Sequence, residues 1–419
     1  MLCSCERSSP IQQRELHNGM SIILDQKDDA DIVSVLLLVR AGSITDTETT
    51  QGLAKLVQTS LFQQTNTSAD VQMKITSLAA KYFSGLYPDF AYFGITARSQ
   101  YLDNILDLVR EIIYQSTFSD SLIEAKKFQM QQNVIQSQNN PRVQLAHTFR
   151  KALFNHHPYR FSGYGTLETI PSLSLENVRE FHQAYYTPAN MTLIITGHFN
   201  PKEISPKRIP LLDVGEEIRP PVKTWRPQWK HDGQTVVKAV HQYGPDIAFV
   251  ALGWIAPCIQ NKETYATDLL LGCLGIGESS RLNVQVRDKL PGVYYTWAEY
   301  ITTREPGCFV MNAICHPDQI ENVKNAFLNE IKIIQNDSVT PKELQRTKQY
   351  FQSLEAYQNE DVVGASFAIG YWAALSDYSF AQNYLKTLRE ITLKDIQNTS
   401  QSYFDLDNYT WCVLMPENE

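Results

Sequence analysis

The sequence lacks the patterns by which membrane-spanning, nucleic-acid-binding and exported chains are recognised. No apolar run approaches the length of a bilayer-spanning helix. Charged residues make up only 20% of the 419 residues, and the net charge of −8 is spread without long runs, so the basic patch that nucleic acid requires is missing. The first residues have no signal-peptide pattern. As written, the chain is expected to be cytoplasmic, or periplasmic or organellar if a leader has been removed.

Cysteine is scarce and does not form a metal-binding or disulfide framework. The seven cysteines are odd in number, most lie in apolar segments, and no pair has the spacing of a zinc ribbon. They stand at positions 3, 5, 258, 273, 308, 315 and 412. We therefore expect them to be small, buried hydrophobic side chains.

The sequence does contain enough apolar residues, 43%, for a large core and two or more domains. Residues 92–130 predict a strand, a helix and a second, capped helix, and residues 309–350 repeat this plan about 218 residues later. Each half also begins with two strands and a helix, predicted at 21–26, 31–40 and 52–64 and again at 236–242, 247–255 and 262–274. This repetition predicts an α+β fold of two duplicated domains, each a mostly antiparallel sheet of about five or six strands with helices packed on one face.

A proline-rich stretch divides the two halves. Five prolines fall between residues 204 and 233, where hydrophobic periodicity is weak, which is typical of an extended linker. We predict an N-terminal domain at residues 1–205, an interdomain linker at 206–232 and a homologous C-terminal domain at 233–419.

One predicted helix, within residues 52–65, is informative for what its polar face lacks. Apolar residues at helical spacing should bury one face, and the opposite face carries Lys55, Gln58 and Thr59. In the inverted zincins this spacing is His-x-x-Glu-His, which supplies two zinc ligands and a general base. A lysine would repel a dication, glutamine cannot take a proton as a carboxylate can, and threonine is a poor zinc ligand. Alone, the three residues indicate only a solvated helix face.

Several segments around that helix, and further along the chain, match the sequence pattern of one protein family. They are Ala41-Gly42-Ser43, Gly52-Leu53-Ala54, Leu61-Phe62, Asn139-Asn140-Pro141, His156-His157-Pro158-Tyr159, Gly165-Thr166 and Tyr186-Thr187-Pro188-Ala189-Asn190-Met191. In this combination the chain resembles the pitrilysin/insulinase-type metallopeptidases from about residue 14 to residue 416. The resemblance implies that each chain of this fold forms half of a clam-shell chamber.

The same resemblance implies that the zinc site has been lost in this chain. Catalytic members take a third zinc ligand from a glutamate downstream of the motif. The matching region, residues 128–140, holds no carboxylate, and its counterpart is Asn133. His156 and His157 are the only candidate substitutes, but adjacent histidines cannot both face one site, so we expect a turn histidine and a packing histidine. The four degenerate positions are therefore Lys55, Gln58, Thr59 and Asn133.

The second half retains a different pair of family residues. A glycine turn at 275–277 precedes Ser280-Arg281-Leu282, and Arg287 and Tyr294 follow seven residues apart across a further turn. The resemblance implies that this pair reaches the substrate in trans, where both side chains can donate hydrogen bonds to a developing oxyanion. Considered alone, an arginine at a helix end and a tyrosine packed in a strand would explain them as well.

The resemblance implies a metal-free, non-catalytic subunit of a heterodimeric zinc endopeptidase of the processing type. In this hypothesis the chain holds no cofactor, a homologous partner subunit holds the zinc, and unfolded peptides are cut inside the shared chamber with the help of Arg287 and Tyr294. The alternatives are a structural or assembly scaffold of the same fold, and a peptide-binding subunit with no peptidase role.

Overall fold

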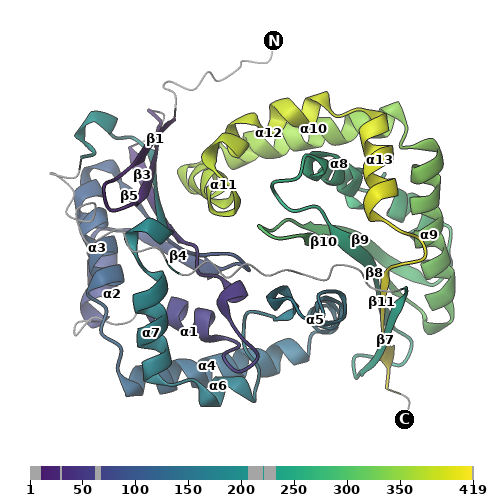
Figure 1. Ribbon diagram of the computed structural model, residues 1–419, viewed down its shortest axis with the longest axis horizontal. Helices are drawn as coiled ribbons and strands as arrows, with labels where there is room; N and C mark the ends of the chain where they lie inside the picture. Colours follow the sequence, from purple (N-terminus) through teal and green to yellow (C-terminus); the bar gives the residue numbers. More distant parts are fainter. Residues whose placement is uncertain (1–10, 29–30, 62–67, 206–219, 221–232, 418–419) are drawn as a thin grey trace. The chain divides into compact units, whose positions relative to one another are not determined.

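The computed structural model describes residues 11–28, 31–61, 68–205, 220 and 233–417 (Figure 1). It contains two compact units. The first comprises Met1–Val134, Gly163–Thr224 and Ala356–Ala381, and the second comprises Ile135–Ser162, Trp225–Glu355 and Gln382–Glu419. The predicted linker at 206–232 lies outside the described residues, apart from Pro220. Within the part of the chain that is described, no helix is long and apolar enough to cross a membrane.

The first unit is built on a six-stranded sheet. Its strands, in spatial order, are β1 (Gln12–Glu15), β2 (Ser21–Gln26), β6 (Met191–Gly197), β3 (Ile32–Val39), β5 (Ala91–Arg98) and β4 (Lys81–Leu86). All neighbours are antiparallel except β2 and β6. Because side chains alternate along a strand, Val33, Val35 and Leu37 of β3 face the main core, whereas Leu36 and Leu38 point to the other face.

Helices cover both faces of this sheet. The main core lies under α1 (Leu53–Ser60), α2 (Ser68–Ser77), α3 (Leu102–Tyr114), α4 (Asp120–Gln138), α6 (Thr169–Ser172) and α7 (Leu175–Tyr185). The opposite face is covered by α11 (Val362–Leu375), which comes from the far end of the chain (Figure 1). It approaches closely, because a Cβ added at Gly370 would lie 2.9 Å from Leu36 Cδ2.

The second unit repeats this plan with five strands. Their order is β7 (Thr235–His241), β11 (Thr410–Pro416), β8 (Ala248–Ala256), β10 (Gly307–Cys315) and β9 (Val293–Ile301), and only β7 and β11 are parallel. The helices are α8 (Glu263–Gly275), α9 (Ile320–Asp337), α10 (Pro341–Gln358), α12 (Tyr378–Glu390) and α13 (Leu393–Tyr403). The other face carries α5 (Pro141–Leu153), whose Phe149 packs against Gly253 of β8. The π-helical segment η8 (Leu282–Arg287) precedes β9.

The two sheets share one topology, so the predicted duplication of an α+β domain is confirmed. The order β2-β6-β3-β5-β4 in the first unit corresponds to β7-β11-β8-β10-β9 in the second, with the parallel pair at the same place. The structure adds to the predicted layering one helix on the second face of each sheet. Each of these helices comes from the other half of the sequence, and this explains why residues 135–162 and 356–381 exchange units.

Candidate functional site

The helix with the degenerate motif, α1, is fixed at its first turn by a carboxylate. Gly52 stands at the N-terminus of α1 with a φ of 94°, a conformation that favours glycine. The carboxylate of Asp46 accepts hydrogen bonds from the backbone amides of Gly52 at 2.9 Å and Ala54 at 3.1 Å. Because these amides have no partner within the helix, Asp46 acts as a cap and holds the motif residues in place.

Three of the four degenerate motif positions line one cavity in the first unit. Its volume is about 260 Å³, and its lining comes from α1, from β4 at the edge of the sheet, and from α4. The lining residues are Lys55, Thr59, Tyr82, Ser84, Lys126, Gln129, Met130, Asn133 and Tyr164. Asn133, chosen from the sequence as the counterpart of the third ligand, therefore lies beside Lys55 and Thr59.

Gln58, the fourth position, is buried behind the cavity and joins a chain of hydrogen bonds. Lys55 Nζ donates to Gln58 Oε1 at 2.8 Å, and Gln58 Nε2 donates to Ser84 Oγ at 2.9 Å. The hydroxyl of Tyr82 donates to the same Ser84 oxygen at 2.5 Å. The hydroxyl of Thr59 turns back to the carbonyl of Lys55 at 2.9 Å. The motif residues are thus bound to one another and to β4.

The residues of this cavity do not fit zinc. None of the described residues that line it is His, Cys, Asp or Glu, and no group of three such residues that could hold a metal occurs in the described part of the chain. Burial and the neighbouring charge of Lys126 lower the pKa of Lys55, and burial lowers the pKa of Lys126. When protonated, these two lysines would repel a dication, and we derive no metal chemistry for this cavity.

Lys126 is the residue that the sequence reading missed. It lies on α4 two turns before Asn133, and Gln129, Met130 and Asn133 share its helix face at spacings of three, four and seven. That spacing was visible in the sequence. However, a lysine on a helix usually points to solvent, and only the cavity that α4 lines together with α1 and β4 shows otherwise.

In the second unit, Arg287 ends η8 and is bound by two carboxylates. Its Nη2 lies 3.0 Å from Glu278 Oε2, and its Nε lies 2.8 Å from Asp288 Oδ1. These hydrogen bonds raise the pKa of the guanidinium, which stays charged. The side chain of Glu278 is 87% exposed, so this pair lies in water and is easily exchanged for another anion or carbonyl.

Tyr294 occupies a bulge in the edge strand β9. Tyr295 pairs with Ile314 of β10 and Val293 pairs with Cys315, so Tyr294 has no partner in the ladder. Bulges of this kind redirect a side chain, and Tyr294 is 52% exposed. It lines a cavity of about 570 Å³ together with Asn139, Asn140, Pro141, Arg142, Tyr243, Ile247, Phe249 and Ile314. Arg287 does not line this cavity.

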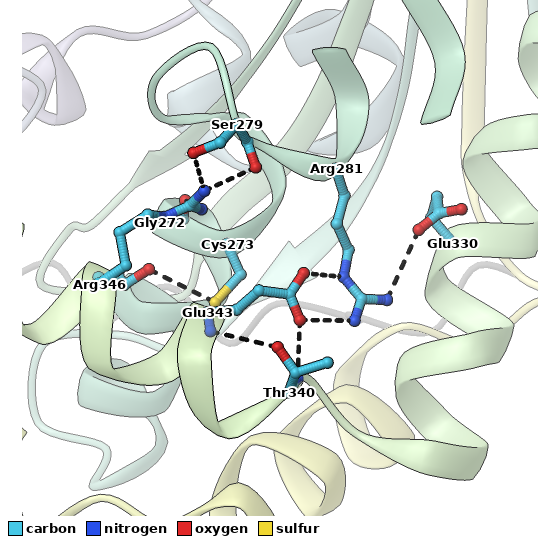
Figure 2. Close-up of polar contacts among 9 residues, drawn as sticks. Gly272, Cys273, Ser279, Arg281, Glu330, Thr340, Glu343 and Arg346 are labelled. Atoms are coloured by element: carbon cyan, nitrogen blue, oxygen red, sulfur yellow. Dashed lines mark hydrogen bonds and ion pairs between the residues drawn. The ribbon is translucent and has the colours of Figure 1, made fainter. Parts of the chain in front are cut away.

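The segment that carries Arg287 is anchored by a buried ion-pair network (Figure 2). Arg281 Nε donates to Glu343 Oε1 at 2.7 Å, and its Nη1 lies 3.6 Å from Glu330 Oε2. Burial alone would raise the pKa of Glu343, but hydrogen bonds from Arg281 and Thr340 lower it to about 2. The arginine of the Ser-Arg-Leu motif thus serves packing and ties η8 to α9 and α10.

The two adjacent histidines play the structural roles expected of them. His157 is buried, and its Nδ1 accepts a hydrogen bond from the backbone amide of Tyr159 at 3.2 Å. Burial lowers the pKa of His157 to about 4, so it is neutral near pH 7. His156 is exposed. Neither lines the cavity at α1.

Two models of known protein families match the sequence of this chain. Residues 21–166 match the family model described as Insulinase (Peptidase family M16), and residues 172–351 match the one described as Peptidase M16 inactive domain. The chain belongs to peptidase family M16. The resemblance to the insulinase-type metallopeptidases drawn from the sequence is confirmed, and the M16 inactive domain spans much of the half that carries Arg287 and Tyr294.

Relatives and solved structures extend along almost the whole M16 chain. A protein named zinc protease PqqE from Helicobacter pylori is 23% identical over 96% of this chain and 92% of its own length. The crystal structure of a protease from Helicobacter pylori superposes with a TM-score of 0.86 at 19% identity, over 97% of this chain and 99% of the other. The structure of a peptidase M16 inactive domain from Pseudomonas fluorescens gives 0.87 at 18% identity, over 98% of both chains. These structures confirm the two-domain fold of helices and mostly antiparallel sheets.

Proposed function

We propose that this M16 protein is the non-catalytic subunit of a zinc endopeptidase made of two homologous chains. The observation that carries the proposal is an M16 fold in which lysine, threonine and asparagine stand at the positions that the resemblance assigns to zinc ligands, and glutamine at the position that it assigns to the general base. The proposal assigns the zinc to a homologous partner subunit and takes unfolded peptides as the substrate. The zinc-protease names of the relatives support the substrate class.

Strand β4 is the proposed point of contact for the peptide in the first unit. It is one of the two edge strands of its sheet, and its Tyr82 and Ser84 line the cavity at α1. An edge strand presents unpaired backbone groups, to which an extended peptide can add as a further strand. Hydrogen bonds between main chains do not depend on the side chains of the peptide. Such pairing therefore suits a subunit that accepts unfolded peptides of varied sequence.

Tyr294 and Arg287 are the proposed contribution to the partner's active site. The bulge leaves the Tyr294 hydroxyl on an exposed ring, where it can donate a hydrogen bond to the oxygen of a peptide carbonyl as negative charge develops on it. Arg287 would exchange its exposed carboxylate partners for the backbone carbonyls of the peptide. Neither role requires a change of protonation near pH 7.

The test uses Tyr294→Phe in the reconstituted pair, with Tyr295→Phe as the matched control. Both changes remove one hydroxyl from neighbouring rings of β9, but Tyr295 stacks against Arg142, whose guanidinium lies 4.8 Å from its ring centroid. Loss of an oxyanion donor should lower the turnover number about 100-fold or more in Tyr294→Phe, and Tyr295→Phe should stay near the wild type. Steady-state kinetics measures turnover, and size exclusion checks that the pair still assembles.

The same preparation tests the metal assignment, because the zinc content of the pair should equal that of the partner alone. Stoichiometric zinc retained by this chain after dialysis would refute this assignment.

One observation favours the scaffold alternative, namely that Arg287 is already held by Glu278 and Asp288. An unchanged turnover number in Tyr294→Phe, with a correctly assembled pair, would leave the scaffold function ahead.

A further inference from the structure

The cavity at α1 holds two positive charges that lack a counter-charge among the described residues. Lys126 is only 7% exposed and Lys55 is half-buried. Both ammonium groups donate to neutral amide oxygens, Lys55 to Gln58 at 2.8 Å and Lys126 to Gln129 at 3.3 Å. The ring of Tyr164 lies 6.0 Å from Lys55 Nζ and adds a weak cation–π contact.

Two other lysines of the same unit pair with carboxylates. Lys127, next along α4 and equally buried, binds Glu124 at 2.8 Å, and Lys74 binds Glu111 at 2.9 Å. A buried charge is costly unless an opposite charge or several hydrogen bonds compensate it. The absence of a carboxylate among the described residues that line the cavity therefore distinguishes Lys126 from the equally buried Lys127.

Hydrogen-bond donors surround the two charges. Ser84 Oγ accepts from both Gln58 Nε2 and the Tyr82 hydroxyl, so its own hydrogen remains to be donated, and Ser84 lines the cavity. The amide of Asn133 lines the opposite wall, from α4. At about 260 Å³ the cavity is smaller than a typical pocket for a drug-sized ligand and suits a compact group.

We propose that this cavity binds a compact oxyanion, a carboxylate or a phosphate group, held between Lys55 and Lys126 with Ser84 and Asn133 as hydrogen-bond donors. Charge-assisted hydrogen bonds to such a group are stronger than those to the amide oxygens that the lysines now contact. The degenerate metal site has thus inverted its preference, from a cation to an anion. The inference needs neither a partner subunit nor peptidase activity, so it stands or falls separately from the proposed function.

The test is isothermal titration calorimetry of the full chain at constant ionic strength. The probes are inorganic phosphate, the dipeptide N-acetyl-Ala-Ala with a free carboxylate, and the same dipeptide with an amidated end. At least one anionic probe should bind with a dissociation constant of about 1 mM or lower, and the amide should not bind. Binding of phosphate alone would assign the site to phosphate groups, and binding of the free dipeptide would assign it to peptide carboxylates.

Variants locate the binding. Lys55→Met and Lys126→Met should each weaken it about tenfold or more, because each removes one charge-assisted hydrogen bond. Lys81→Met is the matched control, since Lys81 is exposed on β4 and does not line the cavity. If Lys126→Met fails to fold, Lys55→Met at the half-buried position carries the test. No binding of either anionic probe, or unchanged binding in the Lys55→Met variant, would overturn the proposal.

Discussion

Asp268 offers a quantitative test of the packing in the second unit. It lies on α8, is 8% exposed, and its Oδ2 accepts a hydrogen bond from the Tyr384 hydroxyl at 2.6 Å. Burial raises the pKa of Asp268 from 3.8 to about 7, although the hydrogen bond from Tyr384 acts in the opposite direction. The folded protein therefore keeps this carboxyl protonated over a range of pH in which the unfolded chain ionises it.

Stability should fall with rising pH across this range. Below pH 3.8 the carboxyl is neutral in both states and imposes no penalty. As the pH rises from 3.8 to about 7, ionisation of the carboxyl stabilises the unfolded state. The free energy of unfolding therefore falls by about 1.4 kcal/mol per pH unit. Above about pH 7 both states are ionised and the penalty stays at about 4 kcal/mol.

Asp268→Asn removes this penalty and keeps an oxygen for Tyr384. Its free energy of unfolding, relative to the wild type, should rise by about 3 to 4 kcal/mol between about pH 4 and about pH 8. Urea unfolding followed by circular dichroism over this pH range measures the difference. Asp337→Asn, at an exposed aspartate on α9, is the control for the loss of a carboxylate at the surface. Parallel pH profiles for Asp268→Asn and the wild type would refute the reasoning.

Two further predictions concern the segment around η8. Because the pKa of Glu343 is lowered from 4.5 to about 2, its pairing with Arg281 contributes stability above pH 4.5 that is lost toward pH 2. Glu343→Gln should thus lower the free energy of unfolding by about 3 kcal/mol at about pH 7 and much less at about pH 3, measured by urea unfolding. Gly277→Ala should cost only about 1 kcal/mol, since its φ of 81° strains alanine but the space around it is open. Gly275→Ala should lower the free energy of unfolding by about 2 kcal/mol or more, because its Cβ would lie 2.7 Å from the Ala298 backbone nitrogen. Equal shifts of the melting temperature in the two glycine variants would contradict this prediction.

The sequence predicted those parts of the site that depend on local periodicity. Lys55 and Thr59 share a helix face by spacing, and the surrounding motifs led to Asn133, which lines the same cavity. Lys126 could not be assigned in this way, because helical spacing shows which residues share a face but not what that face contacts. The bulge at Tyr294 also escaped prediction, since it depends on the register between β9 and β10.

For the fold, too, the features that depend on local sequence patterns were predictable, and the packing between distant segments was not. The duplicated order of strands and helices followed from patterns within each half, and the five prolines suggested the division between them. The exchange of α5 and α11 did not follow, because each helix packs on a sheet formed by residues distant in sequence. The sequence near residue 141 or 362 predicts a helix, but it does not indicate on which sheet that helix packs.

The exchange of α11 has a consequence for the order in which the chain can fold during synthesis. The six strands of the first sheet are complete once residue 197 has been made, yet α11, which covers Leu36 and Leu38 on its second face, ends at Leu375. For nearly half of translation, a finished sheet would therefore present an apolar face to water. Such a face is prone to aggregation, so a nascent chain at this stage is a natural client for a chaperone at the ribosome. The first unit, although it begins the sequence, is completed almost last.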